Sequence, residues 1–412
     1  MTVQDAVDRM MSGLLQASHQ VTLDRLPGVV SEHARIAGID QVVIYLADIQ
    51  QTVLRRLGAH WHLPPPSGGA VAADDAPDEL RIDSTYGGRA FQEVRVLRKT
   101  TDTEVLCWWV PLLDGTQRLG VLRVHTSRPP EEVETVIRDL ASLVGLIVVH
   151  SRPYSDGYAR IVRSRPMNVA AEMLWNLMPP MTFANPEVTV SGVLEPAYEI
   201  GGDAFDYALD DHTLHLAIFD AMGHDLAAGL AANLAMAASR NHRRQGMDLA
   251  GNSAAVEELL VRELGEHTRY LTSVMADLDL RTGELTWVNR GHHPPVVIRG
   301  GRWVTTLECP PAHPIGMSLD LPVVVCKEQL EPDDRLLLYT DGIVEAGSGE
   351  GREFGMSRFV DFIIRHCASR MPVPETLRRL VKDVLDYNEG RLQDDATVLL
   401  TEWHGPSAAH AC

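Results

Sequence analysis

The sequence predicts an α+β protein with more than one domain. Its 412 residues exceed the usual size of a single domain. Residues 1–150 show helical periodicity at both ends and strand-like runs between them. Residues 188–403 contain many short strand patterns separated by hairpin turns, with helices in pairs. The second pattern favours a core of two sheets flanked by helices.

The first 150 residues have the elements of a small α+β module. Apolar spacing predicts helices over residues 1–20, 26–38 and 131–149. The residues at 63–79 are rich in Pro, Gly and Asp, which predicts a solvated loop. The predicted strands are 42–47, 53–57, 105–112 and 120–125.

A connecting segment follows at 151–180. Its first residues have the composition of a linker, and residues 158–178 have the apolar stripe of one helix, with Pro166 as a possible kink. A stripe between two modules predicts either a coupling or dimer helix or plain packing, and the residues leave both interpretations open.

The remaining chain is predicted to form one domain over 181–404, followed by a polar tail at 405–412. Four helices are expected within it, at 226–244, 252–267, 357–367 and 373–388. The expected strands are 188–194, 204–209, 213–219, 271–280, 284–289, 294–299, 302–307, 323–330, 335–340 and 396–403.

Composition excludes several classes of partner. The formal net charge is 37 − 56 = −19, which argues against nucleic acid and against an anionic membrane. The N-terminus lacks the basic and apolar regions of a signal peptide, and the longest apolar run, 140–149, is too short to span a bilayer. Five scattered cysteines without a CxxC pair predict reduced thiols and a cytoplasmic protein.

Carboxylates at strand ends and glycine turns carry the chemistry. Asp203 lies beside a Gly-Gly turn, Asp220 follows the apolar run 214–219, and Asp341 and Asp394 lie in later turns. Converging carboxylates repel one another unless cations compensate them. Oxygen donors favour Mg²⁺ or Mn²⁺ over zinc, and two such ions activate water against a phosphate ester. We therefore expect metal-assisted hydrolysis.

Five motifs lie in one order along this half of the chain. They are Glu199-Ile-Gly-Gly-Asp-Ala-Phe-Asp206, Asp220-Ala-Met-Gly-His224, Asn289-Arg-Gly-His292, Leu338-Tyr-Thr-Asp-Gly342 and Asp394-Asp-Ala-Thr397. With them, residues of about 180–403 resemble the metal-dependent protein phosphatase (PPM, or 2C-type) family, in its bacterial sporulation-E-like branch. The resemblance implies an α-β-β-α two-sheet phosphatase fold and two Mn²⁺ or Mg²⁺ ions.

The same resemblance implies roles for individual residues. Asp203 and Asp220 bind the metal pair, with Asp220 bridging the two ions. The carbonyl group of Ala221 adds a backbone oxygen, and Asp341 and Asp394 complete one metal site. The four aspartates are the predicted catalytic residues, and together with Ala221 they are the predicted metal ligands.

Four further residues have two readings each. Asp395 and Asp206 have a hydrogen-bonding or outer-metal role, or are simple turn or strand-end carboxylates. Asp225 caps the helix that follows it, or else tunes metal affinity by its charge. Arg290, where the family commonly has Ala, contacts the substrate phosphate or has no such role.

The N-terminal module resembles a GAF domain. The resemblance rests on Gly87-Gly88-Arg89-Ala90-Phe91, on the strand 108–112 and on residues 119–124. It implies a domain that binds a small molecule or dimerises. His60 and His62 are interpreted as surface histidines rather than as metal or haem ligands.

Together these features predict a GAF-regulated phosphatase acting on phosphoserine or phosphothreonine. The implied substrate is a regulatory protein of the anti-anti-sigma (STAS) type in a partner-switching pathway, and a homodimer is expected. The alternative is a non-catalytic sensor scaffold that binds a signalling partner. Residues 201–205 are also similar to the GGDEF signature of diguanylate cyclases, but the acidic fourth position is missing, which disfavours that reading.

Overall fold

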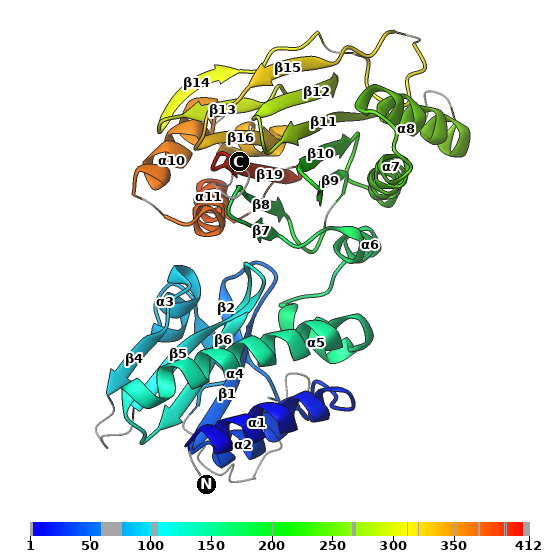
Figure 1. The fold of residues 1–412 in the computed structure, drawn as a ribbon. Helices are drawn as coiled ribbons and strands as arrows, with labels where there is room; N and C mark the ends of the chain where they lie inside the picture. Colours follow the sequence, from blue (N-terminus) through cyan, green and yellow to red (C-terminus); the bar gives the residue numbers. More distant parts are fainter. Residues whose placement is uncertain are drawn as a thin grey trace. The chain divides into compact units, whose positions relative to one another are not determined.

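The computed structural model describes residues 3–58, 76–100, 106–199, 201–265, 269–310, 312–319, 321–348, 352–369, 371–390, 392 and 394–406. The chain divides into two compact units, Met1–Arg165 and Pro166–Cys412 (Figure 1). The histidines at 60 and 62 and most of the predicted loop, residues 63–75, lie outside the described residues.

The N-terminal unit is built on an antiparallel six-stranded sheet in the order β3-β2-β1-β6-β5-β4. Helices α2 and α4 pack their apolar stripes on one face of the sheet, α1 packs on these two helices, and α3 covers the other face. The elements are α1 (Val3–Ser18), α2 (Leu26–Ile36), β1 (Gln41–Ala47), β2 (Val53–Arg56), β3 (Glu79–Arg81), α3 (Tyr86–Glu93), β4 (Leu97–Thr100), β5 (Leu106–Asp114), β6 (Gln117–Thr126) and α4 (Pro130–Ser151).

The connecting segment differs from the single helix predicted for 158–178. It contains the short turn η1 (Arg152–Tyr154) and two separate helices, α5 (Asp156–Val162) and α6 (Val169–Leu177). Pro166 disfavours helical backbone in the residue before it, so the first helix ends early. Asn168 then begins the second helix, because its side chain accepts a hydrogen bond from the Ala171 amide at 2.7 Å.

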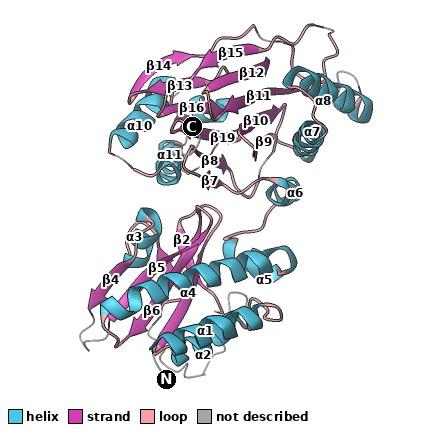
Figure 2. Cartoon of the chain, in the orientation of Figure 1, coloured by secondary structure: helices cyan, strands magenta, loops and turns pink. Residues whose placement is uncertain are grey.

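The C-terminal unit contains two facing antiparallel sheets, as the strand and helix pattern predicts. One has the order β15-β12-β11-β10-β9 and the other β14-β13-β16-β19-β8-β7. Helices α7 and α8 cover the first sheet, and α10 and α11 cover the second, which gives an α-β-β-α arrangement (Figure 2). The core lies between the sheets and beneath each helix pair.

The described elements of this unit follow in chain order. They are β7 (Thr182–Ala184), β8 (Val188–Glu195), β9 (Asp203–Asp210), β10 (Thr213–Ala221), α7 (Leu226–Arg244), α8 (Leu249–Leu264), β11 (Leu271–Asp279), β12 (Glu284–Arg290), β13 (Val296–Arg299), β14 (Arg302–Thr306), β15 (Cys326–Gln329), β16 (Asp334–Tyr339), α9 (Asp341–Val344), β17 (Gly347–Ser348), β18 (Arg352–Glu353), α10 (Met356–Ala368), α11 (Val373–Tyr387) and β19 (Ala396–Trp403).

One cysteine pair corrects the prediction of reduced thiols. Cys309 and Cys326 form a disulfide that joins the segment after β14 to the start of β15. The buried Cys107 is a free thiol. Among the helices that the structure describes, none combines the length and apolar character needed to cross a bilayer.

Candidate active site

Two of the predicted carboxylates lie side by side where β9 and β10 meet. Asp203 begins β9, and it pairs directly with Asp220 near the end of β10. Directly opposite residues of an antiparallel pair point to the same face. This face is turned toward the second sheet, because Phe205 on the same side of β9 rests against Gly192 of β8, where an added Cβ would lie 2.3 Å from the ring.

The other predicted carboxylates come from neighbouring strands of the second sheet. Asp341 begins the short helix α9 just after β16, and Asp394 and Asp395 directly precede β19. Strands β16 and β19 are paired up to this end. The two segments are in close contact, since an added Cβ at Gly342 would lie 2.0 Å from the Asp395 carbonyl oxygen.

Asp395 clamps the Gly-Gly turn that leads into β9. Its buried Oδ2 accepts hydrogen bonds from the backbone amides of Gly201, Gly202 and Asp203 at 2.8, 2.6 and 3.3 Å. A carboxylate that accepts several backbone N–H groups fixes the backbone that carries them. Asp395 therefore ties the start of β9 in one sheet to the start of β19 in the other.

Thr340 forms a second tie between the sheets. Its hydroxyl group donates a hydrogen bond to Oδ2 of Asp203 at 2.6 Å and accepts one from the Thr397 amide at 2.9 Å. Since Thr340 directly precedes Asp341, this contact fixes the two carboxylates relative to each other. Sequence reasoning did not identify Thr340, whose partner is 137 residues away in the chain.

The Ala221 carbonyl, the predicted backbone ligand, faces the same turn. An added Cβ at Gly202 would lie 2.2 Å from that oxygen, closer than real Cβ contacts allow. Only glycine therefore fits at position 202, and the absent side chain lets the turn approach the carbonyl group.

Burial and crowding raise the pKa values of these acids. Burial, followed by the charges of Asp220 and Asp395, raises the pKa of Asp203 well above its usual value. Burial, with the charges of Asp341, Asp394 and Asp395, raises the pKa of Asp220 to about 7. The pKa of Asp341 is raised by burial and by Asp394. The acids therefore share one electrostatic environment, in which a nearby cation favours their ionised forms.

The donor atoms fit a divalent cation that binds through oxygen. The predicted set consists of carboxylates and one backbone carbonyl, which are the ligands that Mg²⁺ and Mn²⁺ prefer. The structure describes all four carboxylates. In no set of three do oxygen atoms, one from each side chain, all lie within 4.8 Å of one another. They are spread along the strand ends, so the fit rests on donor type and on their mutual electrostatic effect.

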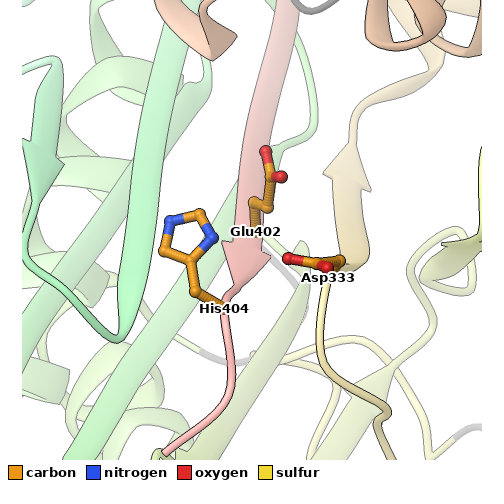
Figure 3. Close-up of side chains that lie close together, drawn as sticks. All are labelled: Asp333, Glu402 and His404. Atoms are coloured by element: carbon orange, nitrogen blue, oxygen red, sulfur yellow. The ribbon is translucent and has the colours of Figure 1, made fainter. Parts of the chain in front are cut away.

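A different group does reach that spacing within the described part of the chain. Asp333, Glu402 and His404 offer ligand atoms within 4.8 Å of one another (Figure 3). Glu402 already pairs with Arg335 through two contacts of 3.1 Å, and Nε2 of His404 is 3.0 Å from Thr189 Oγ1. The group lies at the opposite end of β16 and β19, roughly 24 Å from the predicted site, since seven residues separate Glu402 from Asp395 at about 3.4 Å per residue.

Asp206 lies outside the predicted metal site. It is three residues from Asp203 on the same strand, so its side chain points to the opposite face, toward α7. There the buried carboxylate pairs with Arg240 at 2.6 Å and with Arg243 at 3.1 Å. Of the roles left open for Asp206, these contacts favour hydrogen bonding, on the face that is turned away from the proposed metal site.

Asp225 caps α7, which was the first of its two predicted readings. Its Oδ1 accepts a hydrogen bond from the Ala228 amide at 2.9 Å, and its Oδ2 is 2.7 Å from Nη2 of Arg269. Both contacts lower the pKa of Asp225, the backbone hydrogen bond most. Arg269 also donates to the Met222 carbonyl at 3.2 Å, so it braces the turn after Asp220, a role that sequence reasoning missed.

The burial of Arg290 favours the second of its two readings, in which it has no contact with the substrate phosphate. Its side chain is 0% exposed. It pairs with Glu257 of α8 and donates hydrogen bonds to the Ser253 hydroxyl at 3.1 Å and to the His313 carbonyl at 2.8 Å. A buried guanidinium needs such partners, so Arg290 joins β12 to α8 and to the loop before β15.

The C-terminal unit is a two-sheet α-β-β-α domain in which acidic residues gather at the strand ends. Residues 210–404 match the family model described as Stage II sporulation protein E (SpoIIE). Residues 210–404, just under half of the chain, are therefore similar to the SpoIIE family. This confirms the sporulation-E-like resemblance of the C-terminal half, whereas the GAF resemblance of residues 1–150 stays a prediction.

Individual relatives were found as well. The chain is 27% identical over 168 residues to phosphoserine phosphatase RsbP of Bacillus subtilis, covering 39% of this chain and 41% of RsbP. It is 19% identical to phosphoserine phosphatase RsbU of Bacillus subtilis, covering 78% and 92%. The solved SiaA-PP2C domain of Pseudomonas aeruginosa matches with 24% identity and a TM-score of 0.46, covering 52% and 85%. The chain spans less than half the length of RsbP.

Proposed function

We propose that the protein is a metal-dependent phosphatase that hydrolyses phosphoserine or phosphothreonine on a regulatory protein. The observation that carries the proposal is the crowding of Asp203, Asp220, Asp341 and Asp394 at one end of the two sheets in a domain similar to the SpoIIE family. Carboxylates whose pKa values are raised by one another are typical of sites that act with cations.

Two Mn²⁺ or Mg²⁺ ions would be held by these four carboxylates and by the Ala221 carbonyl. Bound there, the ions would acidify a water molecule and offset the charge on the phosphoryl oxygens. The reaction consumes water, breaks the P–O bond and releases inorganic phosphate and the serine or threonine hydroxyl group.

Other residues of the chain hold the ligands in place. Asp395 fixes the backbone before Asp203, and Thr340 orients the Asp203 carboxylate by a short hydrogen bond. Partners of this kind commonly change metal affinity by about 10- to 100-fold when they are removed. The site is thus supported from both sheets before any ion binds.

The proposed substrate class rests on the relatives. RsbP and RsbU are named phosphoserine phosphatases, which supports a phosphoprotein substrate for this chain. We propose an anti-anti-sigma protein of the STAS type as that substrate, in the cytoplasm. The N-terminal unit, proposed to be GAF-like, would regulate the activity through a small-molecule ligand or a homodimer, with α5 and α6 as the connection.

Phosphate release tests the proposal. The full chain is assayed on p-nitrophenyl phosphate and on a phosphorylated STAS-type protein, with Mn²⁺ or with EDTA. We expect Mn²⁺-dependent turnover that falls at least 100-fold in Asp341→Asn. The matched control is Asp211→Asn at the β9–β10 hairpin, where the side chain is 84% exposed and the φ of 51° suits asparagine.

The outcomes separate the two functions considered. Turnover that needs Mn²⁺ and survives in Asp211→Asn supports the phosphatase. A folded chain that binds Mn²⁺ and the partner protein, yet hydrolyses neither substrate, would support the non-catalytic scaffold instead. Turnover that is unaffected by EDTA would contradict the proposed metal site.

A further inference from the structure

A buried histidine connects the two sheets beside the proposed metal site. His292 follows β12 and is 7% exposed. Its Nδ1 is 2.6 Å from the Thr272 hydroxyl of β11, and its Nε2 is 3.0 Å from the Tyr339 carbonyl at the end of β16. We call this Thr272–His292–Tyr339 connection the histidine bridge.

The hydrogen bonds define the state of the ring. A carbonyl oxygen only accepts, so Nε2 carries the proton that it donates to Tyr339. Nδ1 then accepts the hydroxyl proton of Thr272. Burial, with a smaller effect of His293, lowers the pKa of His292 to about 3, so the ring is neutral at neutral pH.

The backbone around His292 is fixed independently of the ring. The Asn289 side chain accepts a hydrogen bond from the His292 amide at 2.8 Å and donates one to the His292 carbonyl at 2.9 Å. Gly291, at a φ of +70°, forms the turn between them. The ring is therefore held at a set position between the two sheets.

Both ends of the bridge lie next to proposed metal ligands. Thr272 is the direct partner of Asp220 across β10 and β11, so their Cβ atoms are about 4.5–5.5 Å apart and on the same face. Tyr339 lies two residues before Asp341. The bridge thus connects the strand position beside Asp220 to the segment that carries Asp341.

A second connection lies on the other side of Asp220. Asp203 is its direct partner across β9 and β10, and the Asp203 carboxylate accepts the hydrogen bond from Thr340. Asp220 is therefore bracketed: one neighbour is tied to Tyr339 through His292, and the other is tied to Thr340 directly. Two ties set both the separation and the relative rotation of the strand ends, which one tie alone does not.

We infer that His292 is a positioning residue, which sets the separation of Asp220 and Asp341 through the histidine bridge and so tunes the affinity for the metal ions. This inference rests on the proposed metal site. His292 itself contacts neither the proposed ligands nor the substrate. Its effect is expected in metal affinity rather than in the acid–base chemistry of the reaction.

The test removes one hydrogen bond and leaves the shape of the side chain. Thr272→Val takes away the hydroxyl group that His292 Nδ1 needs, and Thr272→Ser retains it. The structure supplies a matched control in Thr189→Val, which removes another threonine–histidine hydrogen bond of 3.0 Å at the far end of the second sheet. Its partner is His404, which Figure 3 shows.

Mn²⁺ binding to the full chain is measured by titration calorimetry, and the thermal midpoint is measured in EDTA. We expect Thr272→Val to weaken Mn²⁺ binding about tenfold, as seen when partners of metal ligands are removed. Thr272→Ser and Thr189→Val should stay within about twofold of the wild type. Comparable losses of midpoint in the two valine variants, with a loss of affinity only in Thr272→Val, would support positioning over a general structural role.

Two results would overturn the inference. One is a folded Thr272→Val chain that binds Mn²⁺ as tightly as the wild type. The other is an equal loss of affinity in Thr189→Val, which would show that any destabilised sheet weakens the site. A folded wild-type chain that binds no Mn²⁺ would instead refute the proposed metal site, so the two failures can be told apart.

Discussion

The variant Asp206→Asn distinguishes a structural role of this residue from a metal-binding role. The carboxylate is 1% exposed and pairs with Arg240 at 2.6 Å and with Arg243 at 3.1 Å. Removing one partner of a buried ion pair costs about 3–5 kcal/mol. The two arginine side chains are 18% and 13% exposed and thus partly reached by water, so we expect the lower limit, about 3 kcal/mol.

The assay is differential scanning calorimetry of the full chain in EDTA. For a domain of 150–250 residues, 1 kcal/mol shifts the midpoint by about 2–4 °C, so the C-terminal unit should unfold about 6–12 °C earlier. Asp211→Asn, at the exposed hairpin, should leave the midpoint within about 1 °C, as surface substitutions away from such contacts cost little. Mn²⁺ affinity should be unchanged in both variants. An unchanged midpoint combined with weakened Mn²⁺ binding would refute the structural role of Asp206.

Three further predictions concern the site and its support. In EDTA, the thermal midpoint of the wild type should fall relative to that of Asp220→Asn as the pH rises from about 4 to about 7. The pKa of Asp220 is about 7 in the folded chain and ordinarily 3.8, so the folded chain binds this proton more tightly and loses the resulting stabilisation as Asp220 ionises. A relative rise of the midpoint would contradict this expectation. Gly202→Ala should reduce Mn²⁺ affinity and p-nitrophenyl phosphate turnover at least tenfold, because the new Cβ meets the Ala221 carbonyl, whereas Gly28→Ala, with open space around it, should not. Arg290→Met should destabilise the chain by about 3 kcal/mol in urea unfolding, because the Glu257 carboxylate loses its guanidinium partner and keeps only His313 and the Ser318 amide. The KM for p-nitrophenyl phosphate should stay unchanged, and a raised KM would support a contact between Arg290 and the substrate phosphate.

Much of the C-terminal fold follows from local patterns. Strong periodicity predicts the helix over residues 226–244, which is α7 as observed, and the strands 213–219 and 396–403 lie within or coincide with β10 and β19. Acidic residues beside glycine turns mark where strands end. These signals lie within a few residues of one another, so a single sequence carries them.

Contacts between distant segments could not be predicted in the same way. The hydrogen bond from Thr340 to Asp203 spans 137 residues, and that from Gly201 to Asp395 spans 194. The Cys309–Cys326 disulfide likewise depends on how a loop returns to a sheet edge rather than on a spacing motif. Such pairs follow from sheet order, which one chain does not specify.

The sequence held a signal against one of the roles left open for Asp206 and against one predicted helix. The alternation of side chains along a strand already places Asp203 and Asp206 on opposite faces, so they could not share one site. Pro166 already disfavoured a continuous helix over 158–178. For Arg290, in contrast, the buried partners come from α8 and from the loop at 312–318, and no local pattern indicates them.

Calorimetric titration of the full chain with Mn²⁺, in the wild type and in Asp220→Asn, measures directly whether Asp220 belongs to a metal centre. We expect two ions per wild-type chain, with affinity reduced at least 100-fold in the variant, because Asp220 is proposed to hold both ions. A folded wild-type chain that binds no Mn²⁺, or a variant that binds it as tightly as the wild type, would contradict the proposed metal centre.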